Sequence, residues 1–177
     1  IFEAKNLGRV TEYIDKKAKE SDITLDLMLL LHKMLISNIR DEIAGRFRKI
    51  GEWVRVGSHI GADPKDILQK LTQVLIVLYG ETEKKSIIQR VAQFHLAFES
   101  IHPFCDGNGR IGRVLNNYIL IREGYVPINI AFTNRAHYYA AFKEYEATGK
   151  TSGMEKIVAQ ALLISYHKRL AYLESKE

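Results

Sequence analysis

The sequence predicts an all-α protein that carries one short β-hairpin. Apolar residues recur at helical spacing along most of the 177 residues. Only three prolines interrupt the chain, at positions 64, 103 and 127, so few points force a helix to end. Residues 52–61 are the exception, because they alternate with a period of two and contain Gly57 and Gly61, a pattern typical of a hairpin.

Helical periodicity defines seven expected helices. They cover about residues 4–20, 24–39, 64–80, 83–100, 110–123, 134–148 and 152–174. The apolar segment LDLMLLLHKMLI at 25–36 is too short to cross a membrane, so we expect a core helix there. His32 and His95 lie on apolar helices, and we expect both to be hydrogen-bonded core residues rather than ligands.

The composition is that of one ordinary globular domain, with 46% hydrophobic and 27% charged residues. The net charge is +5, but lysines and arginines are scattered and no basic block interleaves with aromatics, which disfavours nucleic acid as a partner. A single cysteine, Cys105, favours a reducing compartment, and we expect a cytoplasmic protein. No signal peptide or membrane span is predicted. The chain starts at Ile1, which suggests a part of a longer protein.

Residues 102–113, HPFCDGNGRIGR, form the most informative segment. Pro103 disfavours helix at His102, which therefore lies at a helix end or in a loop. The residues from Asp106 to Gly109 strongly favour a turn, and apolar residues recur at helical spacing after it. A glycine-rich turn that opens a helix presents free N–H groups and a partial positive charge to an anion.

The side chains of this segment suit a nucleotide polyphosphate. Arg110 and Arg113 share one helix face, and guanidinium groups match phosphate oxygens. Asp106 offers the hard oxygen that Mg²⁺ prefers, and His102 is the nearby side chain able to take a proton at neutral pH. DGNG alone is usually a surface turn, but the combination favours function. A zinc site with Cys105 does not fit, because the ligand spacing matches no standard site.

This segment resembles the HxFx(D/E)GNGRxxR signature of the Fic family, whose members typically transfer AMP from ATP to a hydroxyl side chain of another protein. The similarity extends to GRFR at 45–48, FHLAFESIHPF at 94–104, NNYILIREGYVPI at 116–128 and RAHYYAAF at 135–142. The resemblance implies a Fic-type helical bundle with a small β-hairpin flap beside the active-site loop. It also implies a core domain at 25–177, preceded by an N-terminal helical extension at 1–24.

The resemblance implies a role for each motif residue. His102 would be the general base that deprotonates the target hydroxyl, and Asp106 would bind Mg²⁺. Asn108, with the backbone N–H groups of Gly107 and Gly109, would hold the α-phosphate.

The remaining motif residues would complete the nucleotide site. Arg110 and Arg113 would hold the β- and γ-phosphates, and Phe104 would be buried and anchor the loop. Gly109 favours nucleotidyl transfer, because a related branch with Lys at this position transfers the γ-phosphoryl group instead.

By the same resemblance, the hairpin would be a flap whose edge pairs with the target protein by strand addition. The flap residues would be Val54, Arg55, Val56, Gly57, Ser58 and His59. An ordinary short hairpin is the alternative.

The resemblance also implies a base pocket near the flap and the helix that contains residues 138 and 139. Tyr138 and Tyr139 would lie beside the nucleoside, although core packing is an equal alternative. Glu146 stands where close relatives often carry an Asn in contact with adenine, which leaves the choice of base open.

The expected activity is therefore that of a protein adenylyltransferase using ATP and Mg²⁺. The alternatives are transfer of another group such as UMP or phosphocholine, removal of AMP from a modified target, or a non-catalytic nucleotide-binding module. Many Fic proteins carry an inhibitory (S/T)xxxE(G/N) helix, which only Thr151 to Glu155 approximates here. We expect the inhibitor to lie upstream or on a separate antitoxin chain, and a homodimer stays open.

Overall fold

The computed structural model describes residues 1–80, 82–130 and 134–177, and it confirms the all-α class with one small hairpin. Each of the seven expected helices is present in the described residues. They are α1 (Phe2–Lys17), α2 (Leu25–Ile36), α3 (Ile67–Gly80), α4 (Ile87–Ile101), α5 (Asn108–Arg122), α6 (Arg135–Thr148) and α7 (Ser152–Glu174), and a 3₁₀ turn, η1 (Pro64–Asp66), precedes α3.

The ends of two helices differ from the expected ones for local reasons. α2 ends at Ile36 rather than near residue 39, because the chain turns at Asn38, whose φ is +65°. α4 begins at Ile87 rather than near residue 83. Ser86 and Gln89 form a reciprocal capping box there, which satisfies two backbone N–H groups that a helix start leaves free.

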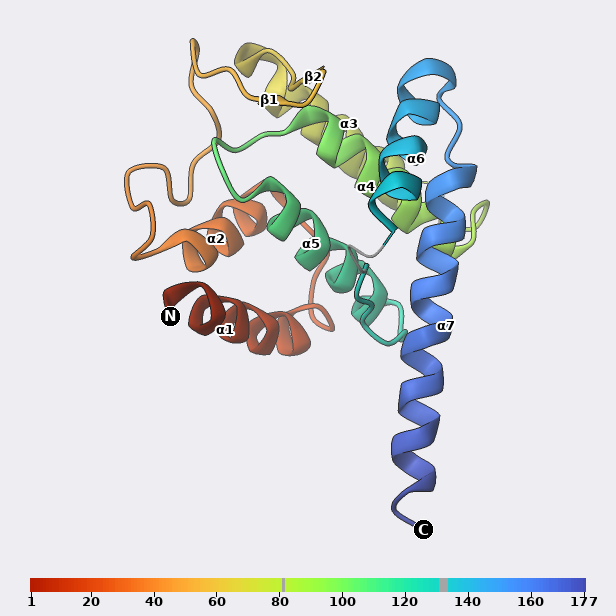
Figure 1. Ribbon diagram of the computed structural model, residues 1–177. Coiled ribbons are helices and arrows are strands. Elements are labelled where there is room, and N and C mark those ends of the chain that lie inside the picture. Colours follow the sequence, from red (N-terminus) through yellow and green to blue (C-terminus); the bar gives the residue numbers. More distant parts are fainter. Residues whose placement is uncertain (81, 131–133) are drawn as a thin grey trace.

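The predicted hairpin is formed by β1 (Arg55–Val56) and β2 (His59–Ile60), which pair antiparallel with Arg55 opposite Ile60. Gly57 at the turn has φ +60°, a conformation that glycine adopts without steric cost. Figure 1 shows the hairpin at the top of the molecule, above the end of α4 and beside α6.

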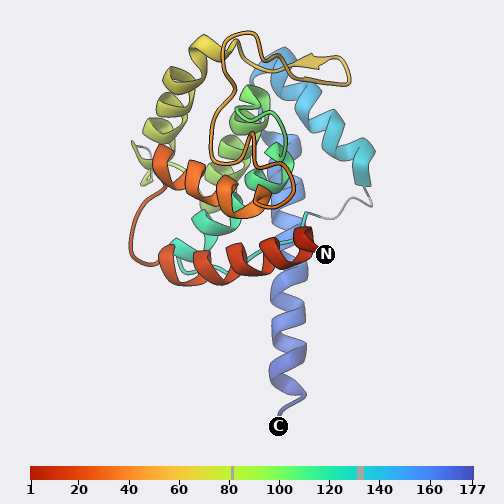
Figure 2. The same cartoon turned by 90° about the vertical axis from the view of Figure 1, so that its left-hand side faces the viewer.

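α4 lies at the centre of the bundle and packs against α3, α5 and α7. Its buried side chains surround the helix, as expected of a helix enclosed by others. α1 packs on α2 and α5 through Val10 and Ile14 and forms the lower layer of Figure 2, with α2 above it. The loop that joins α4 to α5 is therefore anchored at both ends by packed helices, and it lies on the side of the molecule that carries the hairpin.

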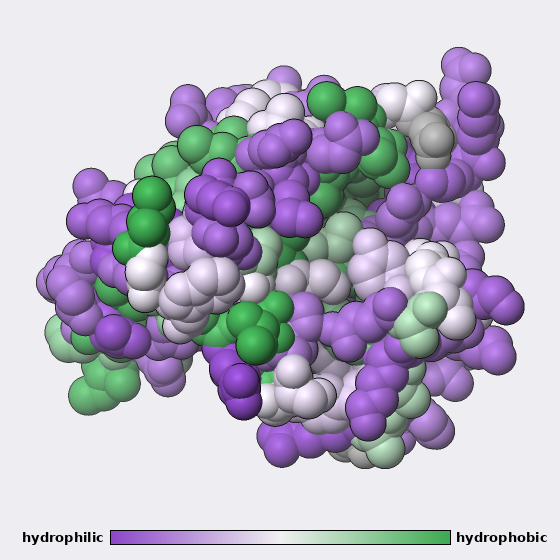
Figure 3. Space-filling view, turned by 90° about the horizontal axis from the view of Figure 1, so that it is seen from above, coloured by the Kyte–Doolittle hydropathy of each residue, from purple (hydrophilic) through white to green (hydrophobic). Residues whose placement is uncertain are grey.

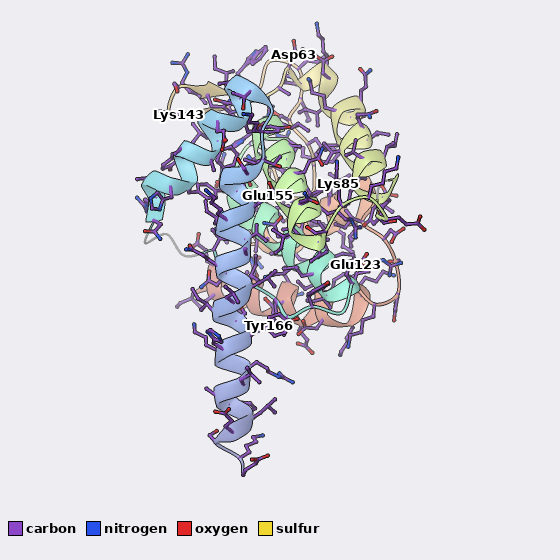
Figure 4. All side chains as sticks on the ribbon, turned by 90° about the vertical axis from the view of Figure 1, so that its right-hand side faces the viewer. Asp63, Lys85, Glu123, Lys143, Glu155 and Tyr166 are labelled. Atoms are coloured by element: carbon purple, nitrogen blue, oxygen red, sulfur yellow. The ribbon has the colours of Figure 1, made fainter. Side chains whose placement is uncertain are left out.

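α7 packs against α4 and α6 with its first half and then extends below the body. Glu155 lies in the upper part of this helix, and Tyr166 lies near the point where it leaves the body (Figure 4). Over the described ranges, we find no helix that combines the length and the apolar character that a membrane crossing needs.

Candidate active site

The loop between α4 and α5 begins at His102, which caps α4 in a left-handed conformation with φ +49°. Its backbone N–H donates to the Phe98 carbonyl over 3.1 Å. The ring Nδ1 contacts the Glu99 carbonyl, which can only accept. Nδ1 therefore carries the proton, and Nε2 is left as an acceptor. Burial lowers the pKa of His102, so the imidazole is neutral at pH 7.

Asn108 ties the loop closed with its side-chain amide. Its Nδ2 donates to the Phe104 carbonyl over 2.8 Å, and its Oδ1 accepts from the Phe104 N–H over 2.9 Å. These two bonds use one N–H and one lone pair of the buried amide, and the contact with the α-phosphate that the resemblance implies for Asn108 stays a prediction. The first turn of α5 leaves backbone N–H groups without helical partners, which suits an anion, and the Gly107 N–H just before it donates to Asp106 Oδ1 over 2.7 Å.

Phe104 is fully buried, as expected, and stacks in parallel on His32 at a centroid distance of 3.8 Å. The Gly45 N–H donates to His32 Nδ1 over 3.0 Å, so Nε2 carries the proton and donates to the Asp106 carbonyl over 2.9 Å. His32 is thus a hydrogen-bonded core residue, as predicted. Its hydrogen bond to the Asp106 carbonyl fixes the middle of the loop.

Arg48 holds the first part of the loop, a role that sequence reasoning missed. This arginine is only 4% exposed, and it donates to the carbonyls of Ile101, His102, Ala62 and Glu52 at 2.6–3.1 Å. Its own N–H donates to the Pro103 carbonyl over 2.9 Å. The GRFR segment at 45–48 was the available signal, although it carried no indication of what the arginine binds.

The anion-facing part of the loop combines a helix start with two guanidinium groups. Gly107 has φ +83°, and a Cβ there would lie 2.9 Å from Ile36 Cδ1, so the turn requires glycine. Arg113 reaches back over the first turn of α5, because its Nη1 would lie 3.3 Å from a Cβ at position 109. Arg110 pairs with Glu3 of α1 at 3.2 Å and lies 3.8 Å from Asp106.

The Asp106 carboxylate is about half exposed, and its arginine partners, Arg40 and Arg110, are both 3.8 Å away. One carboxylate together with nucleotide phosphates is an ordinary ligand set for Mg²⁺. The described residues offer no group of three or more His, Cys, Asp or Glu side chains that could hold a metal ion. The Mg²⁺ site at Asp106 therefore stays a prediction.

A buried polar cluster lies behind the arginines. The Asn116 amide donates to His95 Nδ1 over 2.9 Å, so His95 Nε2 carries the proton and donates to the Tyr138 hydroxyl over 2.7 Å. Burial lowers the pKa of His95 to about 3, which keeps the ring neutral. His95 is a core residue, as predicted. Tyr138 is held by this network, whereas Tyr139 is exposed, so a contact with the nucleoside stays a prediction for both.

Glu99 is a second buried polar residue near the loop that the sequence analysis did not single out. Its carboxyl is buried, Oε1 has no hydrogen-bond partner, and burial raises its pKa to about 7. The positive charge of Arg113 acts in the opposite direction and lowers the pKa of Glu99, by less than burial raises it. Gly112 faces it directly, because a Cβ at that position would collide with Glu99 Oε1.

The flap residues lie beside this loop. Arg55, Val56, Gly57 and Ser58 are exposed, and Trp53 next to them is 58% exposed. Seen from above, on the side of the flap, the surface is largely hydrophilic, with smaller groups of apolar side chains between (Figure 3). His59 turns inward, and its ring centroid lies 6.1 Å from that of His102.

The structure is thus an all-α bundle in which a neutral imidazole and two arginines lie on the loop and first turn that join two central helices. A sequence profile described as the Fic/DOC family matches residues 22–120. This chain belongs to the Fic/DOC family.

Known proteins agree with this assignment. The chain is 35% identical over 126 residues to "Protein adenylyltransferase fic-1" from Caenorhabditis elegans, covering 70% of this chain and 24% of that protein. It thus spans about a quarter of that relative's length. The solved structure of Fic-1 (residues 134–508) from C. elegans matches with a TM-score of 0.82 and 24% identity, over 99% of this chain and 52% of that chain.

A second similar structure contains a nucleotide analogue. It is the BepC protein from Bartonella tribocorum with bound AMPPNP, which matches with a TM-score of 0.61 and 18% identity over 89% of this chain and 86% of that chain. At these identities, both structures establish the fold.

Proposed function

We propose that this chain is the catalytic domain of a protein adenylyltransferase. It would transfer AMP from ATP to a Ser, Thr or Tyr hydroxyl of a target protein and release pyrophosphate. The observation that carries the proposal is the state of His102, whose Nε2 is an acceptor beside the helix start that suits phosphates. The adenylyltransferase name of the C. elegans relative and the AMPPNP in BepC support the same donor.

The reaction follows from these groups. His102 Nε2 takes the proton of the target hydroxyl as its oxygen attacks the α-phosphorus. The new O–P bond forms while the bond to the pyrophosphate oxygen breaks, and pyrophosphate leaves with that electron pair. The backbone N–H of Gly109 would donate to the α-phosphate oxygens, where negative charge builds up, and that of Gly107 would join it by exchanging its 2.7 Å bond to Asp106 Oδ1 for the phosphate.

The two arginines would hold the leaving group. Arg110 and Arg113 present guanidinium groups at the first turn of α5, where bidentate contacts to the β- and γ-phosphates are favoured. Mg²⁺, held by Asp106 and the phosphates, would neutralise charge on the phosphate oxygens. Arg110 must exchange its contact with Glu3 for the nucleotide, so this pair competes with binding.

Labelled nucleotides test the proposal directly. We expect ATP labelled at the α-phosphate to modify proteins of a lysate or the enzyme itself, and ATP labelled at the γ-phosphate not to do so. His102→Ala should abolish transfer while Mg-ATP binding survives, because the base acts on the hydroxyl. His167→Ala, on the exposed part of α7, is the control. Transfer from the γ-phosphate, from UTP alone, or undiminished in His102→Ala would overturn the proposal.

A further inference from the structure

His59 links the flap to two helices. On β2, its Nε2 lies 2.8 Å from the Ser100 carbonyl near the end of α4, and its Nδ1 contacts the Glu146 carboxylate of α6. A carbonyl and a carboxylate can only accept, so both ring nitrogens face acceptors. The Glu146 carboxylate, at the position where the sequence left the choice of base open, is thus directed at the flap.

The rest of the hairpin has little to hold it. The strands contain two residues each, and an isolated two-stranded hairpin is marginally stable in water. Val56 and Ile60 are 44% and 49% exposed. At the base, the Gly61 N–H donates to the Val54 carbonyl and the Ala62 N–H to the Ile101 carbonyl, both over 3.0 Å. These bonds fix where the flap begins but not the strands beyond.

The contacts of His59 also set a distance to the reacting group. Ser100 lies two residues before His102 on the same helix end, so the bond to its carbonyl ties β2 to the element that carries the base. The two imidazole rings lie 6.1 Å apart. Figures 1 and 2 both show the hairpin beside the C-terminal half of α6, where Glu146 anchors it.

We propose that the His59–Glu146 pair is a clasp that positions the flap, and with it the target hydroxyl, over His102. His59 is then a positioning residue, since it acts on the target through the strand that carries it. This inference rests on the proposed function for its effect on transfer. Its structural part, that the pair holds the flap, stands independently.

Amide hydrogen exchange of residues 55–60 tests the structural part in the unliganded protein. We expect His59→Ala, Glu146→Gln and Glu146→Ala each to speed exchange of these amides by about tenfold, because the flap opens more often. The double variant His59→Ala/Glu146→Ala should exchange no faster than the single ones, since both remove the same link. Lys143→Ala, an exposed change on α6 (Figure 4), and His167→Ala are the controls. Unchanged exchange in Glu146→Ala would refute the clasp.

Transfer kinetics test the functional part. With α-labelled ATP and lysate protein as the acceptor, we expect the clasp variants to require about tenfold more acceptor for the same rate, with Mg-ATP affinity within about twofold of wild type. Equal loss of ATP binding and transfer would show a general structural role and overturn the positioning role. If the wild-type protein transfers no AMP, the proposed function fails, and the exchange experiment still decides whether the clasp exists.

Discussion

Glu99→Gln should change how the stability of this protein depends on pH. The Glu99 carboxyl is 6% exposed with one oxygen unpaired, and burial raises its pKa from 4.5 to about 7. Between these values the unfolded chain has lost this proton and the folded chain keeps it, so stability falls as pH rises from 4.5 through 7. At 1.36 kcal/mol per pH unit, the gap corresponds to ~3 kcal/mol.

Glutamine keeps the shape of the neutral acid and cannot ionise, so the variant lacks this loss. Urea unfolding at several pH values between 4.5 and 8 should show Glu99→Gln gaining ~3 kcal/mol relative to wild type over this range. His95 acts in the opposite direction, because its lowered pKa costs stability as pH falls below 6.5, but both proteins contain it and the comparison cancels it. The exposed substitution Glu12→Gln is the control. Parallel curves for wild type and Glu99→Gln would refute a proton held by the buried carboxyl.

Three further substitutions test the surroundings of the loop. Gly112→Ala should lower the free energy of unfolding by ~1–3 kcal/mol in urea, because its Cβ meets Glu99, and combining it with Glu99→Ala should cost less than the two changes added; strict additivity would contradict this contact. Asn108→Ala leaves the Phe104 N–H and carbonyl unpaired and should cost ~2–4 kcal/mol, visible as a lower Tm; an unchanged Tm would show that the amide does not close the loop. Glu3→Gln frees Arg110 and should tighten Mg-ATP binding by up to about fivefold at low salt, with the gain fading at high salt; calorimetry that finds no gain at low salt would exclude competition by Glu3.

Much of the fold could be predicted because it depends on local sequence. Helical periodicity defined every helix, and alternation with glycine defined the hairpin. The start of α4 at Ile87 was missed although Ser86 and Gln89 form a recognisable capping box. The predicted start near residue 83 was drawn from the spacing of apolar residues and not from this capping box.

The parts of the candidate site that were missed depend on tertiary contacts. Arg48 looks like any surface arginine until residues 62, 101 and 102 surround it with carbonyls. Glu99 interrupts the apolar face of α4 and reads as solvated, but α5 covers it through Gly112. His59 and Glu146 are 87 residues apart, and no local pattern indicates that they meet.

The way Asn108 and Arg48 secure the main chain of the loop bears on how fast a ligand is captured. These bonds hold the loop in one shape without a ligand, so the proposed binding of phosphates would require no segment to fold. Association of the proposed nucleotide would then depend on the rate of diffusional encounter with the arginines of this loop, and it would slow as ionic strength rises. Differences in affinity among nucleotides would accordingly appear in how long each one stays.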